Sequence, residues 1–167
     1  TDDTAAIQAA INSGCKRIYF HRPSSTYAFT GLTIGAGTSN LSLVGESYGN
    51  VELRYTPITG NGITFVGEAD NFTMKDIGLR AINNSSGTAI FSNNMSSAPL
   101  RDTIFENLNI SGFLKGIIIQ GGMNGKIVGG RYAGQGKTVI GGIGVQLGED
   151  ANYAYNHGMI EHVYIEV

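Results

Sequence analysis

An internal repeat of about 27 residues constrains the fold of this chain more than any other feature of its sequence. Two short apolar blocks alternate, and the second block follows the first in every copy. The first block has its first apolar position at Leu32, Ile63, Ile90, Ile117 and Ile143. The second block has its apolar position at Leu43, Met74, Phe105, Ile127 and Ile160. Two columns that stay in step predict a coil of stacked turns around a shared apolar core.

The second block also contains a predicted corner. Two positions after its apolar column lies a residue that enters the left-handed αL region readily, and apolar or small residues follow it. These corner residues are Gly45, Asp76, Asn107, Gly129 and His162. A β-sandwich would instead place two-residue turns between its strands. Asn61-Gly62 and Asn124-Gly125 each lie just before a repeat block, so the pattern favours a coil of parallel strands.

The N-terminal stretch "TDDTAAIQAAINSG" predicts one short amphipathic helix. Ile7, Ala10 and Ile11 recur at helical spacing, and Asp2 or Asp3 can accept a hydrogen bond from a free N–H of the first turn. Gly14 supplies the stop. A helix this short is not stable alone in water, so we expect its apolar side to lie against the coil.

Composition excludes several classes of protein. The chain has 167 residues, one domain by length, and its net charge of −2 argues against nucleic acid as a partner. No apolar run reaches the roughly 18 residues of a membrane span, and no signal peptide is visible. The single cysteine, Cys15, cannot form an internal disulfide. The three histidines lack ligand spacing, so we expect no metal or other cofactor, with calcium held by loop carboxylates left open.

Three segments in order, "DDTAAIQAAI", "RIYFHRPSSTYAF" and "LSLVGESYGNVELRY", resemble the N-terminal part of the pectate-lyase superfamily, in the form found in phage tailspikes. The segment 23–26 departs from that pattern. The resemblance implies an all-β, single-stranded right-handed parallel β-helix with a short N-terminal capping helix. We expect the capping helix and first strand over 1–30 and about five rungs over 31–167. The apolar alternation of the final segment, "VYIEV", predicts further rungs beyond Val167.

The same resemblance implies a function. It predicts a phage tailspike-like protein, extracellular or on the virion, that binds and depolymerises a bacterial surface polysaccharide such as capsule, O-antigen or exopolysaccharide. A non-enzymatic phage receptor-binding adhesin is one alternative. A secreted bacterial polysaccharide lyase or glycoside hydrolase is another. Fold alone does not choose among them.

Candidate site residues come from two long insertions between the blocks, at 93–102 and 147–158. Repeat scaffolds place function in such insertions because they leave the core undisturbed. Glu149 and Asp150 are the candidate catalytic carboxylates, with Glu161, Asp102, a further rung or another subunit as the source of a partner. The candidate substrate-binding residues are Tyr153, Tyr155, His157, Asn93, Gln120 and Gln146. A solvated loop and a structural amide ladder are the alternatives for these residues.

A contact surface is also predicted. Phe91 and Ile118 follow inward-facing isoleucines of the first block, so they point outward and form a small exposed apolar stripe. The resemblance implies a parallel homotrimer. We therefore expect this outer face to pack against a neighbouring subunit.

Overall fold

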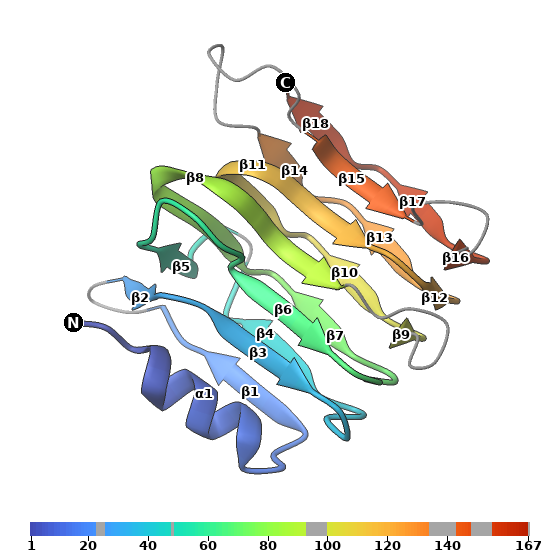
Figure 1. Cartoon of the computed structure of the whole chain (residues 1–167), viewed down its shortest axis with the longest axis horizontal. Helices are drawn as coiled ribbons and strands as arrows, with labels where there is room; N and C mark the ends of the chain where they lie inside the picture. The colour runs from blue at the N-terminus through green and yellow to red at the C-terminus, as the bar shows by residue number, and fades with distance from the viewer. Residues whose placement is uncertain (23–25, 48, 93–99, 134–142, 148–154, 167) are drawn as a thin grey trace.

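The computed structural model describes residues 1–22, 26–47, 49–92, 100–133, 143–147 and 155–166 (Figure 1). The chain forms an all-β parallel solenoid of about four turns with one short helix at its N-terminus. The helix and strands in chain order are α1 (Thr4–Asn12), β1 (Arg17–Phe20), β2 (Tyr27–Phe29), β3 (Leu32–Gly35), β4 (Ser42–Gly45), β5 (Glu52–Tyr55), β6 (Ile63–Val66), β7 (Thr73–Lys75), β8 (Gly78–Ser92), β9 (Leu100–Arg101), β10 (Ile104–Glu106), β11 (Asn109–Ile119), β12 (Gly122–Met123), β13 (Lys126–Val128), β14 (Arg131–Ala133), β15 (Ile143–Leu147), β16 (Tyr155–Asn156), β17 (Met159–Glu161) and β18 (Tyr164–Glu166). The predicted coil is confirmed.

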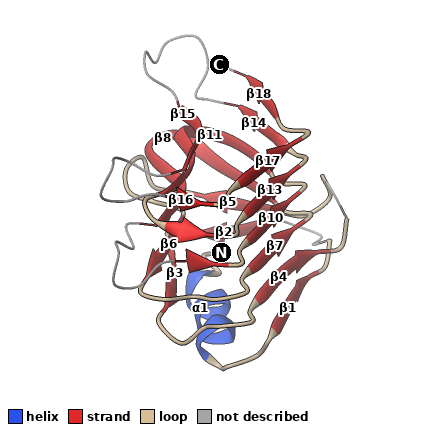
Figure 2. Ribbon diagram, turned by 90° about the vertical axis from the view of Figure 1, so that its right-hand side faces the viewer, coloured by secondary structure: helices blue, strands red, loops and turns tan. Residues whose placement is uncertain are grey.

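The strands stack into three parallel sheets along the solenoid. One sheet, here called sheet A, has the order β1-β4-β7-β10-β13-β17 and forms one side of the molecule (Figure 2). A second sheet contains β18, β14, β11, β8, β5 and β2, with β3, β6 and β15 alongside, and a third contains β16, β12 and β9. The predicted second column is in register throughout sheet A, as Leu43, Met74, Phe105, Ile127 and Ile160.

The first predicted column is confirmed in four copies and wrong in the last. Its first four members, Leu32, Ile63, Ile90 and Ile117, pair in register and are buried. In the fifth copy Val145 pairs with Ile117, whereas Ile143 pairs with Lys115. Val145 and Leu147 pack against the core. Because apolar residues alternate at 143, 145 and 147, the strand's own pattern allows a shift of two residues, and pairing with β11 decides the register.

The predicted αL corner is confirmed in four of five copies. Asp76, Asn107, Gly129 and His162 have φ angles of 57°, 52°, 63° and 53°. Gly45 is the exception, since its φ is not positive. An amide N–H of Asn107 donates to Oδ1 of Asp76 at 3.1 Å, which links two successive corners. These four αL residues therefore turn the chain within one residue, and the corners at Asp76 and Asn107 are bonded to each other.

A second αL column, which the sequence analysis missed, precedes the strands of sheet A. Its members have φ angles between 52° and 64° and are Asn40, Asn71, Asp102, Asn124 and His157. They belong to the same residue types as the first column and each lies just before a second apolar block. Strands β7, β10, β13 and β17 are thus bounded by αL residues at both ends, which fixes their length.

Replacing Asn107 with valine is expected to lower the free energy of unfolding by about 1–3 kcal/mol, because a β-branched residue resists positive φ. Asn107→Gly is the matched control, since glycine tolerates this φ and loses only the hydrogen bond to Asp76. Urea denaturation followed by circular dichroism measures both. Equal losses for valine and glycine would show that the backbone conformation contributes nothing.

The N-terminal helix covers the first turn of the solenoid, as predicted. Ile7 and Ile11 of α1 are buried, and Gly14 ends the helix with a φ of 79°. Asp2 accepts the N–H of Thr4 at 2.9 Å, while Asp3 accepts the N–H of Ala28 at 3.0 Å. The Asp2 carboxylate therefore binds a free N–H of the first helical turn, and the carboxylate of the N-cap residue Asp3 ties the helix to β2.

Gln8 of α1 also completes the hydrogen bonding of an edge strand. Its side-chain oxygen accepts the N–H of Thr33 at 2.8 Å, and its side-chain nitrogen donates to the carbonyl oxygen of Thr33 at 2.9 Å. One amide side chain thus replaces the backbone of an adjoining strand next to β3. Unpaired strand edges invite pairing with other chains, so this contact protects the first turn.

Replacing Gln8 with alanine is expected to reduce stability by about 1–2 kcal/mol, because two hydrogen bonds of about 1 kcal/mol each are lost at an exposed edge. Gln8→Glu is the control that keeps an acceptor for Thr33 and removes the donor. In thermal unfolding, the stability of Gln8→Glu should lie between that of the wild type and that of Gln8→Ala. If Gln8→Ala were as stable as the wild type, water would replace both hydrogen bonds without any loss of stability.

Candidate functional site

Both long insertions connect the same pair of sheets. The segment 93–99 follows Ser92 and precedes Leu100, and the segment 148–154 follows Leu147 and precedes Tyr155. Ser92 and Leu147 both pair with Ile119 of the intervening turn. The residues after the insertions, Leu100 and Tyr155, both pair with Gly122. The described ends of the two insertions therefore meet at one edge of the solenoid, here called the insertion corner.

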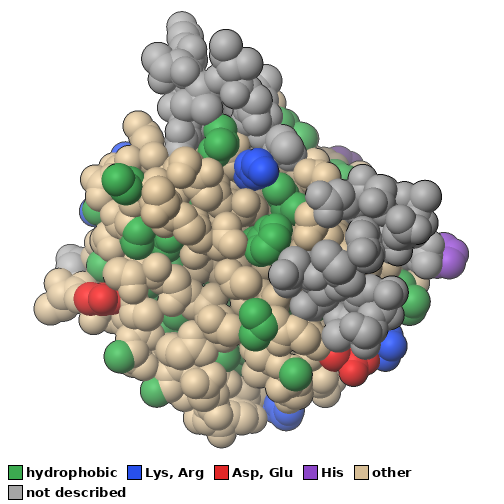
Figure 3. All heavy atoms as spheres, viewed as in Figure 1, with side chains coloured by type: hydrophobic (Ala, Val, Ile, Leu, Met, Phe, Trp, Pro, Cys, Tyr) green, Lys and Arg blue, Asp and Glu red, His purple; other side chains and the backbone are tan. Residues whose placement is uncertain are grey.

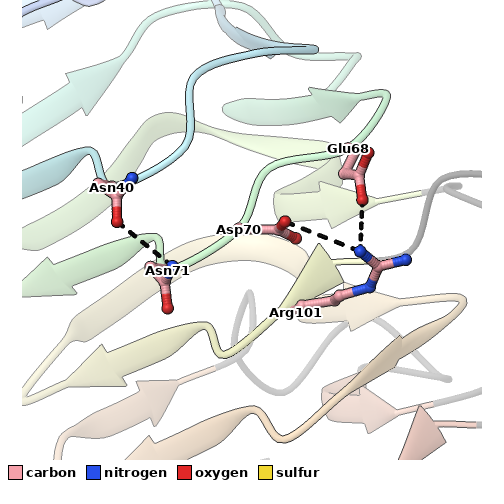
Figure 4. A network of polar contacts seen from close by, with 5 residues as sticks. All are labelled: Asn40, Glu68, Asp70, Asn71 and Arg101. Atoms are coloured by element: carbon pink, nitrogen blue, oxygen red, sulfur yellow. Dashed lines mark hydrogen bonds and ion pairs between the residues drawn. The ribbon is translucent and has the colours of Figure 1, made fainter.

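Three charged side chains lie at the insertion corner (Figure 4). Nη1 of Arg101 is 2.7 Å from Oε1 of Glu68 and 3.8 Å from Oδ2 of Asp70. Arg101 lies in β9, directly after the first insertion, and its backbone pairs with that of Asp70 in a parallel bridge. Ala69 is fully buried between the two acidic residues. Glu68 and Asp70, two residues apart, therefore lie on the side opposite the buried Ala69.

The charges of this group are accessible. The side chains of Glu68, Asp70 and Arg101 are 45%, 29% and 43% exposed. Exposed ion pairs contribute little to stability, typically less than about 1 kcal/mol, so stability alone is a weak reason for three charges here. Oδ1 of Asp70 is buried and has no hydrogen-bond partner among the described residues. The exposed parts of the Glu68 and Asp70 carboxylates, and not this buried oxygen, can accept hydrogen bonds from a ligand.

A polar row leads from this group along the solenoid. Asn71 follows Asp70, and its side-chain amide donates to Oδ1 of Asn40 in the preceding turn at 3.3 Å (Figure 4). Both asparagines belong to the second αL column, so their positions are fixed by the backbone. Asn40 and Asn71 connect the insertion corner to the start of β4 and β7 in sheet A.

The predicted catalytic pair and two of the predicted binding residues lie outside the described part of the chain. These are Glu149, Asp150, Tyr153 and Asn93. Tyr155 begins β16 at the end of the second insertion. His157 is exposed and occupies the second αL column with a φ of 57°. The backbone therefore gives a structural reason for a histidine at that position.

The predicted amide column of Asn93, Gln120 and Gln146 is wrong in its alignment. Gln146 pairs with Ile118 and not with Gln120. Gln120 follows β11, and its N–H donates to the carbonyl oxygen of Ser92 at 3.0 Å. The error has the same cause as the misplaced Ile143, a two-residue shift in β15. A binding role for any of these amides stays a prediction.

The exposed apolar stripe is also wrong for one of its two residues. Phe91 and Ile118 do pair side by side, as predicted, but Ile118 is only 4% exposed. The register places Ile118 between Phe91 and Gln146 on the adjoining strands, whose side chains shield it. In the view of Figure 3, the hydrophobic side chains that are not covered by grey atoms form separate spots. The expected contact between subunits stays a prediction without this stripe.

The two other predicted partner carboxylates occupy different surroundings. Asp102 lies in the second αL column with a φ of 52°, and Glu161 is exposed in β17 of sheet A. The sequence analysis did not select Glu68, Asp70 or Arg101. The available signal was the pair of acidic residues in "GEAD", which fall in the gap between blocks where the next turn carries its insertion.

The described residues contain no group of three or more His, Cys, Asp or Glu side chains that could hold a metal ion. Within the same residues, no helix is long and apolar enough to cross a lipid bilayer. Comparisons with protein-family models, curated proteins and solved structures find no significant match for this chain. The functional argument therefore depends on the fold and on the residues at the insertion corner.

Proposed function

We propose that this protein binds a bacterial surface polysaccharide at the insertion corner and cleaves it, in the manner of a phage tailspike. The observation that carries the proposal is the convergence of two insertions and the Glu68–Arg101–Asp70 group on one corner. Loops on a repeat scaffold can vary in length without disturbing the core, which makes such a corner suitable for recognition. The sequence resemblance supports the choice of ligand, an extracellular location on the virion and a homotrimer.

Glycoside hydrolysis needs two carboxyl groups, about 5–5.5 Å apart for retention or about 6.5–9.5 Å apart for inversion. One protonates the leaving oxygen, and the other attacks the sugar or takes a proton from water. Glu68 and Asp70 contact the same nitrogen of Arg101, so both can reach one glycosidic linkage. In this proposal one of them completes the pair with Glu149 or Asp150.

One feature favours a binding protein without enzymatic activity as the second candidate. Glu68 is held by Arg101 at 2.7 Å, and an ion-paired carboxylate accepts hydrogen bonds but does not donate a proton. Such a group suits the recognition of sugar hydroxyls. A receptor-binding adhesin would use the same corner and the same residues.

The test is incubation of the protein with purified capsular, O-antigen and exopolysaccharides, followed by chain length on size exclusion and by binding. A hydrolase shortens the polymer, a lyase also adds ultraviolet absorbance from a new double bond, and an adhesin binds without shortening. We expect Glu68→Gln, Asp70→Asn, Glu149→Gln and Asp150→Asn to weaken binding or cleavage at least tenfold.

Glu52→Gln is the matched control, because Glu52 forms a comparable ion pair with Arg54 at 2.6 Å on another sheet. It should behave as the wild type. If all four of these variants bind and cleave normally, the functional centre lies elsewhere. If no polysaccharide in a broad panel is bound, the proposed function is wrong.

A further inference from the structure

A shallow hollow of about 490 Å³ lies on the outer face of sheet A, away from the residues assigned above. It forms because one turn carries small outward side chains between turns that carry long ones. Ser42 and Val44 of β4 pair with Arg17 and Tyr19 of β1 on one side. On the other side they pair with Thr73 and Lys75 of β7. The short side chains form the floor, and the long ones form two walls.

The distance between the two walls of the hollow matches the width of one sugar ring in van der Waals contact with both walls. Adjacent strands lie about 4.8 Å apart, so the walls on β1 and β7 stand about 9.6 Å apart. The wall on β1 carries the ring of Tyr19, which is 44% exposed and contacts His21 edge-on at 4.8 Å between ring centroids. An exposed ring held by a neighbouring aromatic is suited to stacking on the apolar face of a pyranose.

The two ends of the hollow differ in hydrogen-bonding character. At the end where the strands begin lie the guanidinium of Arg17 and the hydroxyls of Ser42 and Thr73. The Arg17 side chain has no hydrogen bond or ion pair with any other described residue. At the opposite end lie the carboxylates of Glu46 and Asp76. One end therefore donates to a ligand oxygen, and the other accepts hydroxyl protons.

The remaining cation of the hollow is already engaged. Nζ of Lys75 donates to Oε1 of Glu106 at 2.6 Å, and this hydrogen bond raises the pKa of Lys75. The Lys75 side chain is thus held in place by Glu106 as part of one wall, and its charge is not free to bind an anion. With Glu106 counted, three carboxylates face two cations. This balance disfavours an anionic ligand and suits a neutral one with several hydroxyls.

The hollow lies beside the insertion corner. Ser42 and Thr73 each come two residues after Asn40 and Asn71, the hydrogen-bonded asparagines that lead away from Asp70 (Figure 4). Figure 2 shows β1, β4 and β7 side by side at the same end of sheet A. A polymer at the corner can therefore continue across these two asparagines onto the hollow.

We propose that the hollow on sheet A is a second saccharide subsite that takes one neutral pyranose unit. The polymer's identity rests on the proposed function. Recognition of the single unit rests on the hollow itself. Tyr19 stacks on the ring, Arg17 with Ser42 and Thr73 donates to one edge of the sugar, and Glu46 with Asp76 accepts from the other edge.

The test is a titration of the full ¹⁵N-labelled chain with methyl glycosides of glucose, galactose, mannose, rhamnose and N-acetylglucosamine. For at least one of them we expect saturable shifts of the backbone amides of β1, β4 and β7. Tyr19→Ala and Arg17→Ala should each weaken that binding by about tenfold. Tyr164→Ala is the control, since Tyr164 is an exposed tyrosine on another sheet, and it should bind like the wild type.

The subsite is wrong if none of the glycosides shifts these amides, or if the shifts are unchanged in Tyr19→Ala. Val44→Arg provides a second variant that fills the hollow from the floor and keeps both walls. Normal binding by Val44→Arg would also overturn the assignment. Failure of Glu68→Gln to affect the polymer, with normal glycoside binding in the hollow, would contradict the proposed function alone.

Discussion

Gly112→Ala is expected to lower the free energy of unfolding by about 3–5 kcal/mol, because backbone strain and overpacking act together. Gly112 lies in β11 with a φ of 75°, a backbone conformation that residues with a Cβ rarely adopt. A Cβ at this position would also overlap the carbonyl oxygen of Ala81 in the preceding turn. That oxygen belongs to the backbone, so the clash can be relieved only by moving the turns apart.

Gly14→Ala separates the two contributions. Gly14 has nearly the same φ, 79°, but an added Cβ there would meet nothing within 4 Å. Its loss should therefore be about 1–2 kcal/mol, from the backbone conformation alone. Urea denaturation of both variants gives the difference directly. Equal losses would show that the stacked turns yield to the extra methyl group without cost.

Phe105→Ala is expected to cost about 3–5 kcal/mol, the range observed when a buried phenylalanine is truncated. Phe105 lies in the second apolar column and is 1% exposed. Its ring lies 6.4 Å from that of Phe65 and 6.0 Å from that of Phe72, so aromatic side chains from two successive turns share one part of the core. Removing one ring leaves a cavity that parallel strands fixed at both ends cannot close.

Phe105→Leu is the control for this prediction, since it keeps most of the volume and should cost less than about 2 kcal/mol. Thermal and urea unfolding, followed by circular dichroism, measure both variants. If alanine and leucine at position 105 cost the same stability, the surrounding residues move to fill the cavity left by the ring. The aromatic cluster would then have no special part in holding the turns together.

The second apolar column could be predicted completely because its cause is local. Four of its five members, such as Met74 and Phe105, lie in three-residue strands next to αL residues of recognisable type. The last member of the first column could not be predicted in the same way. Ile143, Val145 and Leu147 alternate, so the apolar pattern allows more than one register, and pairing with β11 distinguishes them.

The candidate site could be predicted only in part for a related reason. The two insertions are visible as longer gaps, so the corner itself follows from the sequence. The contact between Glu68 and Arg101 joins residues 33 positions apart in different turns, and it depends on how those turns stack. The shielding of Ile118 likewise depends on its neighbours in β8 and β15. Such contacts depend on how two turns lie relative to each other, so they cannot be predicted from the sequence of one turn.

The paired αL columns have a consequence for how this protein can change. They bound the short strands β7, β10, β13 and β17 of sheet A at both ends, while the chain between one strand and the next differs in length from turn to turn. Between β8 and β9 the chain carries seven residues, 93–99, where the following turn has only Gln120 and Gly121. The segment between Ser92 and Leu100 can thus be exchanged as a cassette between two anchored ends. Ligand preference can then diverge, by evolution or by grafting, without a new scaffold.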